Sequence, residues 1–279
     1  ARGSTMHKKV AIVSGSNKGI GLAIVRALCL NFDGDVFLTA RDRERGRAAV
    51  KELQTEGLNP KFFQLDITKK DSIKRLAEFI EENYGGLDIL VNNAAIGYLP
   101  GNPTPFPEQA VNTINVNFFG TLNLCRELFP LLRTHARVVN LSSSTGKLPL
   151  LTKQELRQRF LAASTEEDLC TLMNEFVEDA KAGVHKVNGW GPCSYTVSKI
   201  AINALTFLQQ RRFSENPERD IVVNAVHPGR CDTDLVNHMG TLSPDEGAVV
   251  PVYCALLPPG VESPRGEYLW CDKTICSWL

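Results

Sequence analysis

Short, nearly uninterrupted apolar segments alternate with charged, amphipathic segments along most of this chain. The apolar segments are KKVAIVS (8–14), DVFLTA (35–40), KFFQLDI (61–67), LDILVNNAA (87–95) and ARVVNLSSS (136–144). Strands that are buried on both faces of a sheet give continuous apolar runs of this kind, and the segments between them have helical spacing. Because right-handed crossovers join such strands, the pattern predicts an α/β fold with a single doubly wound parallel sheet.

The region from about 147 to 190 departs from this alternation, and we expect a helical insertion there. Within it, Ser164 and Glu167 have the spacing of a capping box. We expect residues 8–279 to form one domain, because no linker or repeat interrupts them. The residues ARGST (1–5), which precede Met6, are interpreted as a cloning remnant. An apolar stripe of helical spacing follows the capping box and is expected to be packing surface, at Leu169, Leu172, Met173, Phe176 and Val177.

The charges of the chain balance, with 31 lysines and arginines against 31 aspartates and glutamates. A neutral chain gives no electrostatic reason to expect binding to nucleic acid or to an anionic membrane. No apolar run reaches the roughly 18 residues that a transmembrane helix needs. The eight cysteines form no C-x-x-C pair and no zinc-like spacing, so we expect reduced thiols, no metal site and a cytoplasmic protein.

Three glycines follow the first apolar segment in the sequence SGSNKGIG. Gly15, Gly19 and Gly21 would allow a tight turn and a close approach of backbone N–H groups to a pyrophosphate, which the positive end of the next helix also attracts. Glycines can mark any tight turn, but the position of these three between a strand and a helix favours a dinucleotide site. The loop lacks the Gly-Lys-Ser/Thr ending of nucleoside triphosphatases, which argues against that class.

The residues near the end of the second apolar segment bear on the choice between NAD and NADP. This segment ends LTAR, so Arg41 stands where an acid would otherwise bind the ribose 2′-hydroxyl, and Lys18 lies in the glycine loop. Two cations favour the 2′-phosphate of NADP, although both could be solvated surface charges and Asp42 could bind NAD instead. Asp66 and Asn93 end two further strands, where they could bind the nucleotide or simply cap turns.

A second set of polar residues lies in the later part of the chain. Tyr195 and Lys199 are four residues apart in SYTVSK, so they share one face of a helix. A nearby ammonium lowers the pKa of a phenol, which could then donate a proton to an alkoxide or accept one from an alcohol. The cluster Ser142–Ser144 could supply a hydroxyl to a substrate carbonyl or fill a turn, and Asn117 could hold a water or bend its helix.

In this order along the chain, the glycine loop, N-N-A, Asn117, the serine cluster and Y-x-x-x-K resemble the short-chain dehydrogenase/reductase family. The resemblance runs from about Lys8 to near the C-terminus and implies a Rossmann-like fold. It implies that Tyr195 is the proton-donating acid and that Lys199 adjusts the pKa of this tyrosine. It also implies that the hydroxyl of Ser143 polarises the substrate carbonyl, with Ser142 as the alternative candidate. Asn117 would keep a water in a proton relay, and Thr233 would contact the nicotinamide carboxamide. The implied cofactor-binding residues are Gly15, Asn17, Lys18, Gly19, Ile20, Gly21, Arg41, Asp66, Ile67, Asn93, Tyr195, Lys199, Pro228, Gly229 and Thr233.

Within that family, NKGIGLAIVRALC, YGGLDILVNNA, LMNEFVEDAK and the long interval between serine and tyrosine are similar to the monomeric NADPH-dependent carbonyl reductases. This similarity implies a monomer that uses NADPH to reduce small carbonyl compounds, namely quinones, aromatic aldehydes and ketones, ketosteroids or prostaglandins. The implied substrate-side residues are Ser143, Gln109, Tyr195 and Arg230.

Three positions depart from the carbonyl reductase pattern. Ala95 replaces a glycine, His227 a cysteine, and Arg230 a tryptophan that lines the pocket. The substrate pocket is therefore expected to differ, and Arg230 would either favour an acidic substrate or point to solvent. Two alternatives remain open: an NAD-dependent hydroxysteroid or alcohol dehydrogenase, and a non-catalytic dinucleotide sensor, in which we would expect a broken Ser/Tyr/Lys set.

Overall fold

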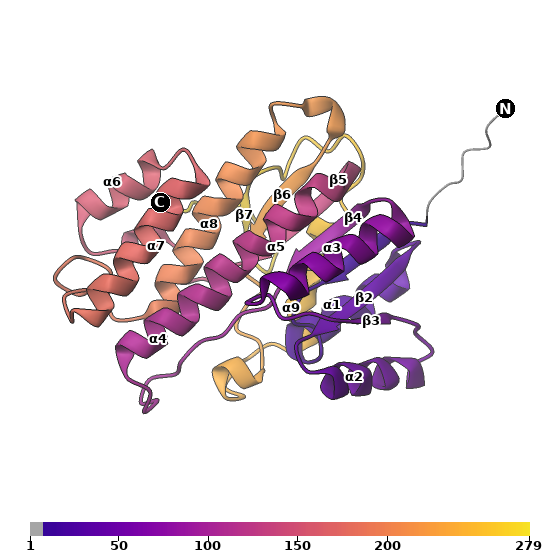
Figure 1. The fold of residues 1–279 in the computed structure, drawn as a ribbon, viewed down its shortest axis with the longest axis horizontal. Coiled ribbons are helices and arrows are strands. Elements are labelled where there is room, and N and C mark those ends of the chain that lie inside the picture. Colours follow the sequence, from indigo (N-terminus) through magenta and orange to yellow (C-terminus); the bar gives the residue numbers. More distant parts are fainter. Residues whose placement is uncertain (1–7) are drawn as a thin grey trace.

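Seven parallel strands form the centre of the structure, a computed structural model that describes residues 8–279 (Figure 1). The predicted remnant at residues 1–5 lies outside the described residues. The strand order is β3-β2-β1-β4-β5-β6-β7, with neighbouring strands parallel throughout, which confirms the predicted single doubly wound sheet. The strands are β1 (Val10–Val13), β2 (Asp35–Ala40), β3 (Lys61–Gln64), β4 (Leu87–Asn92), β5 (Leu132–Leu141), β6 (Val222–Val226) and β7 (Tyr268–Leu269).

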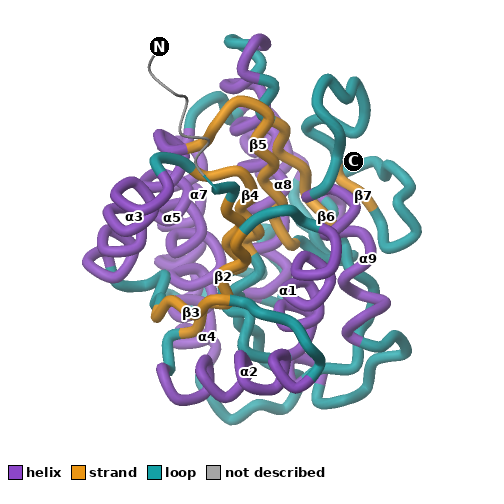
Figure 2. Tube along the Cα trace, turned by 90° about the vertical axis from the view of Figure 1, so that its right-hand side faces the viewer, coloured by secondary structure: helices purple, strands orange, loops and turns teal. Residues whose placement is uncertain are grey.

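Helices cover both faces of the sheet, as the continuous apolar strands require (Figure 2). One face packs against α1 (Gly19–Asn31), α2 (Arg43–Thr55) and α9 (Pro244–Ala255). The other packs against α3 (Lys70–Tyr84), α5 (Thr121–Leu128) and α8 (Ser194–Phe213). Short 3₁₀ turns lie between the larger elements, at Phe129–Leu131, Leu148–Leu150, Pro217–Arg219 and Asp234–Val236. Among residues 8–279, no helix combines the length and the apolarity needed to cross a membrane.

The predicted helical insertion between β5 and α8 consists of α6 (Gln154–Ala162) and α7 (Glu166–Lys181), which pack near α4 (Phe106–Thr113) and α8. Four residues of the predicted stripe are buried and Val177 packs partly buried against them, so the stripe is packing surface. The predicted capping box at Ser164 and Glu167 is wrong by one residue. Instead, Thr165 Oγ1 accepts from the Asp168 N–H at 3.1 Å, and the Asp168 carboxylate accepts from the Thr165 N–H at 2.9 Å. A carboxylate one carbon shorter than that of Glu167 therefore closes the box.

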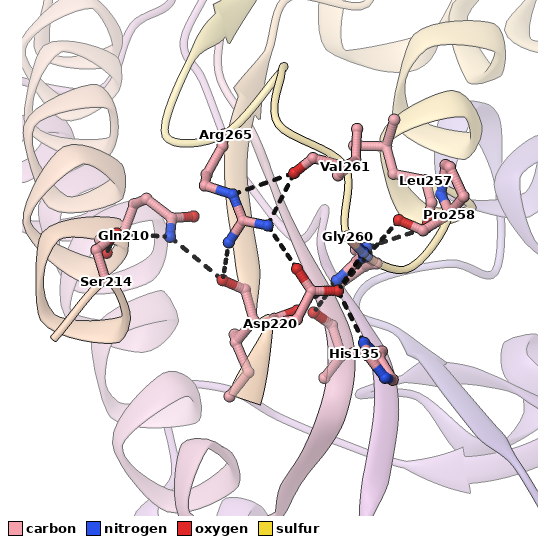
Figure 3. Close-up of polar contacts among 12 residues, drawn as sticks. His135, Gln210, Ser214, Asp220, Leu257, Pro258, Gly260, Val261 and Arg265 are labelled. Atoms are coloured by element: carbon pink, nitrogen blue, oxygen red, sulfur yellow. Dashed lines mark hydrogen bonds and ion pairs between the residues drawn. The ribbon is translucent and has the colours of Figure 1, made fainter. Parts of the chain in front are cut away.

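A buried ion cluster ties the chain after α9 to the amino-terminal end of β6 (Figure 3). Arg137 and His135 donate to Asp220 at 3.0 and 2.8 Å, the Gly260 N–H donates at 2.9 Å, and Arg265 binds the second carboxylate oxygen. Burial alone would raise the pKa of Asp220, but these donors hold that pKa well below its usual range. The cluster therefore stabilises the folded state by keeping a buried carboxylate charged.

We expect Asp220→Asn to lower the free energy of unfolding by about 3 kcal/mol at neutral pH, because Arg137 is left buried beside a neutral amide. The pKa of Asp220 is lower in the folded chain than in the unfolded chain, where it is about 3.9. The stabilisation is therefore complete above that value and is lost as the pH falls below it. Urea denaturation of both proteins from neutral pH down to about pH 3 measures the difference.

A matched control is Asp245→Asn, which removes an exposed ion pair with Arg26 at 3.0 Å. This variant should lose less than about 1 kcal/mol. The stabilising role of the charged Asp220 would be contradicted if both variants lost the same free energy of unfolding. It would also be contradicted if the difference between Asp220→Asn and the wild type did not become smaller at acid pH.

Candidate active site

The glycine loop between β1 and α1 lies directly against the segment that follows β4. Gly15 adopts a φ of +60°, and a Cβ atom placed on it would lie 2.8 Å from the Cα and Cβ of Ala94. A Cβ on Gly21 would lie 2.5 Å from Nδ2 of Asn93. That amide group in turn donates to the backbone oxygens of Ser14 and Gly15 at 3.0 and 2.9 Å. A side chain at either glycine would therefore collide with the segment after β4 and displace the loop.

A cleft of about 490 Å³ opens beside this loop, beyond the carboxyl ends of the strands. This is the position in which doubly wound sheets bind ligands. Four of the predicted cofactor residues, namely Tyr195, Lys199, Pro228 and Gly229, do not line the cleft itself. The predicted cofactor residues that do line it are Gly15, Asn17, Lys18, Gly19, Ile20, Gly21, Arg41, Asp66, Ile67, Asn93 and Thr233. The glycine loop and the N-terminus of α1 that follows it therefore fit the pyrophosphate of an extended dinucleotide.

The two cations predicted at the ribose lie at the cleft, but in different surroundings. Lys18 forms an ion pair with Asp234, which lies in the segment after β6. Arg41 is exposed and has no ion-pair partner among residues 8–279. Asp42, the residue that could have favoured NAD, accepts from the Arg45 N–H at 2.8 Å and caps α2. Asp42 does not line the cleft, whereas Arg41 does.

Asp66 follows β3 by two residues, caps a turn and lies at the cleft. Its Oδ1 atom accepts from the Thr68 N–H and hydroxyl at 2.9 and 2.7 Å, so it caps a turn. The residue also lines the cleft. A turn cap with one carboxylate oxygen committed thus remains compatible with contact to a nucleotide through the other oxygen.

Tyr195 and Lys199 share the face of α8 that packs on the end of β5. Lys199 Nζ donates to the Leu141 carbonyl oxygen at 2.7 Å and lies 5.4 Å from the centroid of the Tyr195 ring. The Ser143 hydroxyl lies close enough to the Tyr195 phenol to lower its pKa. Ser142 is buried and its hydroxyl points to the Lys199 backbone oxygen at 3.5 Å. Of the two candidate serines, Ser143 is therefore the one beside the phenol.

The structure does not show the expected lowering of the phenol pKa by Lys199. Burial raises the pKa of Tyr195 to about 12, and the nearby Ser143 hydroxyl offsets only part of that rise. The ammonium of Lys199 is directed to the Leu141 oxygen and lies over the ring, so the lysine does not contact the phenol oxygen. Burial also lowers the pKa of Lys199 to about 8.

Asn117 lies in a π-helical segment, η1 (Ile114–Gly120), between α4 and α5. Its Oδ1 accepts from the Ile96 N–H at 2.8 Å, and its Nδ2 donates to the Ile96 oxygen at 2.9 Å and to the Ser198 hydroxyl at 3.0 Å. A π-helical turn widens the helix and is common at functional sites. Asn117 thus clamps the segment after β4 to α8, and each of its polar side-chain atoms already has a protein partner.

The remaining predicted substrate and cofactor residues lie at the edges of this arrangement. Gln109 donates to the Thr104 oxygen at 2.8 Å, so it holds the loop before α4. Arg230 is exposed, while its backbone oxygen accepts from the Thr241 and Leu242 N–H groups at 2.8 and 3.2 Å. The structure thus brings together Ser143, Tyr195 and Lys199, but it does not join Gln109 or Arg230 to them.

Sequence reasoning missed several residues that shape the site. The Ser14 hydroxyl accepts from the Asn93 and Ala94 N–H groups at 3.0 Å each, which joins β1 to the chain after β4. Tyr268 donates to the Ser143 backbone oxygen at 2.6 Å from strand β7. A serine that ends an otherwise apolar strand was a usable signal for Ser14. No local pattern marks Tyr268, because its partner is 125 residues away.

Known proteins resemble this chain over nearly its whole length. A family model described as short chain dehydrogenase matches residues 9–154. The rat protein named carbonyl reductase (NADPH) 1 is 50% identical, with 97% of this chain and 99% of the relative covered. The human protein of the same name is 50% identical, with 96% and 98% covered. The structure of salutaridine reductase from Papaver somniferum superposes with a TM-score of 0.85 at 30% identity, covering 94% of this chain and 99% of that one.

We expect Gly15→Ala to weaken dinucleotide binding by about tenfold or more, because the added methyl meets Ala94 at 2.8 Å and displaces the loop. Gly57→Ala is the matched control. Gly57 also has a positive φ, of +81°, but a Cβ there has nothing within 4 Å. Titration of cofactor fluorescence with NADPH measures both affinities. Equal weakening in the two variants would contradict a specific role for the contact at the loop, because Gly57 follows α2 and does not line the cleft.

Proposed function

The chain belongs to the short-chain dehydrogenase family, and on that premise we propose that it reduces carbonyl compounds to alcohols with NADPH. The observation that carries the proposal is the intact set of Ser143, Tyr195 and Lys199 on the end of β5 and the adjoining face of α8. A non-catalytic sensor would have no need for a buried phenol and a buried amine at this place, because burying such groups costs free energy.

The residues around the cleft fit NADPH, which supplies the hydride when it is bound. The glycine loop would hold the pyrophosphate at the N-terminus of α1. Arg41 and Lys18 would bind the 2′-phosphate, with Lys18 leaving Asp234 to do so. Asp66 would accept from the adenine amino group, and Thr233 would contact the nicotinamide carboxamide.

In this proposal Tyr195 is the proton donor and Ser143 orients the substrate. A pKa of about 12 keeps the phenol protonated at neutral pH, so its proton is available for the carbonyl oxygen as negative charge develops there. The Ser143 hydroxyl stabilises the same oxygen by a hydrogen bond. Lys199, with a pKa of about 8, is mostly charged at neutral pH, and it positions Tyr195 by holding α8 against the end of β5. Asn117 acts by fixing α8 against the chain after β4.

The finer parts of the proposal concern the substrates and the state of the protein. We propose quinones, aromatic aldehydes and ketones, with ketosteroids or prostaglandins as further candidates, and a cytoplasmic monomer in which residues 8–279 form one domain. The buried stripe of α7 supports the monomer, since it covers apolar surface of the chain's own α4 and α8. The continuous sheet from β1 to β7 supports the single domain.

We expect Tyr195→Phe to bind NADPH as the wild type does but to lose about a hundredfold or more in kcat, because only the donated proton is removed. Consumption of NADPH with an aromatic aldehyde measures turnover, and fluorescence titration measures binding. The control Tyr253→Phe removes a hydroxyl from α9 on the other face of the sheet and should leave both values unchanged. Turnover that survives in Tyr195→Phe would show that another group donates the proton.

We expect Arg41→Ala to weaken NADPH binding by about tenfold while NADH binding stays the same, because a charge-assisted contact to the 2′-phosphate is lost. Arg47→Ala removes an exposed arginine from α2 and serves as the matched control. A wild-type preference for NADH would favour the rival NAD-dependent alcohol or hydroxysteroid dehydrogenase. An unchanged cofactor preference in Arg41→Ala would remove Arg41 from the site.

A further inference from the structure

The register of the sheet places two further side chains, those of His227 and Trp270, on the face that is covered by α8. Leu141 of β5 pairs with Val226 of β6, which pairs with Leu269 of β7, and all three pack on the face of α1 and α9. Side chains alternate along strands, so the residues that follow, His227 and Trp270, point to the opposite face. That face carries α8 with the catalytic tyrosine and lysine.

Direct contacts connect this row to the catalytic serine. Tyr268, two residues before Trp270, donates to the Ser143 backbone oxygen at 2.6 Å. Lys147 lies four residues after Ser143, and its Nζ is 5.3 Å from the centroid of the Trp270 ring. The His227 ring meets the same indole edge-on, with centroids 4.7 Å apart and an interplanar angle of 84°. The strand that leads to this indole is therefore joined to the backbone of Ser143, and the cation over the indole lies in the same loop as that serine.

The polar atoms of this group are without partners in the described part of the chain. Trp270 Nε1 and His227 Nδ1 are buried and make no hydrogen bond. Lys147 is half-buried, and no carboxylate of residues 8–279 forms an ion pair with it. Buried polar atoms are almost always satisfied, so unpaired ones beside a reaction centre indicate a place for a ligand group. Burial lowers the pKa of His227 to about 4, so its ring is neutral at neutral pH and Lys147 supplies the charge.

We propose that Lys147 and Trp270 determine substrate preference, and that the preferred substrate is an aromatic carbonyl compound bearing a carboxylate or similar anionic group. The inference rests on the proposed function and names the substrate class for the same site. The indole would pack against the aromatic ring of the substrate, and the Lys147 ammonium would pair with its anion. The carbonyl would then remain at Ser143 and Tyr195. Arg230 is the competing cation, but its side chain is exposed and no contact joins it to Ser143.

The test compares 4-formylbenzoate with its methyl ester, which lacks the negative charge and carries one additional methyl group. We expect the wild type with NADPH to have a KM about tenfold lower for the acid. Lys147→Ala should raise the KM of the acid by about the same factor, with kcat and the ester unchanged. Lys147→Arg should keep the preference, and raised salt should weaken it in the wild type. Lys51→Ala, which removes an exposed lysine from α2 at the far edge of the sheet, should change neither substrate.

Calorimetric binding of both compounds to the protein loaded with NADP⁺ separates this inference from the function on which it rests. If NADPH were consumed with neither aldehyde, the proposed function would fail. The assigned preference would still be supported if the acid bound more tightly than the ester to the wild type and this difference disappeared in Lys147→Ala. Equal KM and equal affinity for acid and ester would overturn the inference. A preference abolished by Arg230→Ala and kept by Lys147→Ala would also overturn it.

Discussion

The hydrogen bond from the buried Lys199 amine to the Leu141 carbonyl oxygen, at 2.7 Å, is the interaction on which the catalytic arrangement depends. It joins α8 to the last residue of β5, and the serine loop begins immediately after that residue. Tyr195 lies one helical turn before Lys199, so the same contact brings its phenol to Ser143. An amine in this position has left water and keeps only one strong partner, which lowers its pKa to about 8. The buried Lys199 amine thus fixes the position of α8 and of the Tyr195 phenol, and it supplies the charge of the site.

Asn117 provides the second fixed point. Its amide pairs with both backbone groups of Ile96 and also reaches Ser198, so three separate segments meet at a single side chain. The π-helical turn around it supplies the extra width that this contact needs. At the cleft itself, Asn93 holds the glycine loop through two backbone oxygens. Two side-chain amides therefore fix the glycine loop and the chain after β4 by bonding to their backbone groups.

The sequence predicts the parts of this account that depend on local pattern. Continuous apolar strands and helical spacing predict the parallel sheet, and the glycine spacing predicts the turn beside the cleft, because both signals lie within a few residues. Contacts between distant segments could not be predicted in this way. The pairing of Lys18 with Asp234 joins residues 216 apart, and Trp270 reaches Lys147 only because β7 and the serine loop end side by side. The capping box lies one residue later than predicted, because Thr165 and Asp168 have the same spacing and capping groups as the predicted pair and helix ends are defined by sequence only to within one or two residues.

The most direct test of the account is the protonation of Lys199, followed by carbon-13 NMR of protein labelled at the lysine ε carbons. We expect one lysine signal that titrates with a pKa of about 8 in protein without added cofactor and that is missing from Lys199→Met. The exposed lysines should titrate together near about 10.4. A Lys199 signal that titrated with the exposed lysines would contradict the account, because the amine would then be solvated and would not be held against the end of β5.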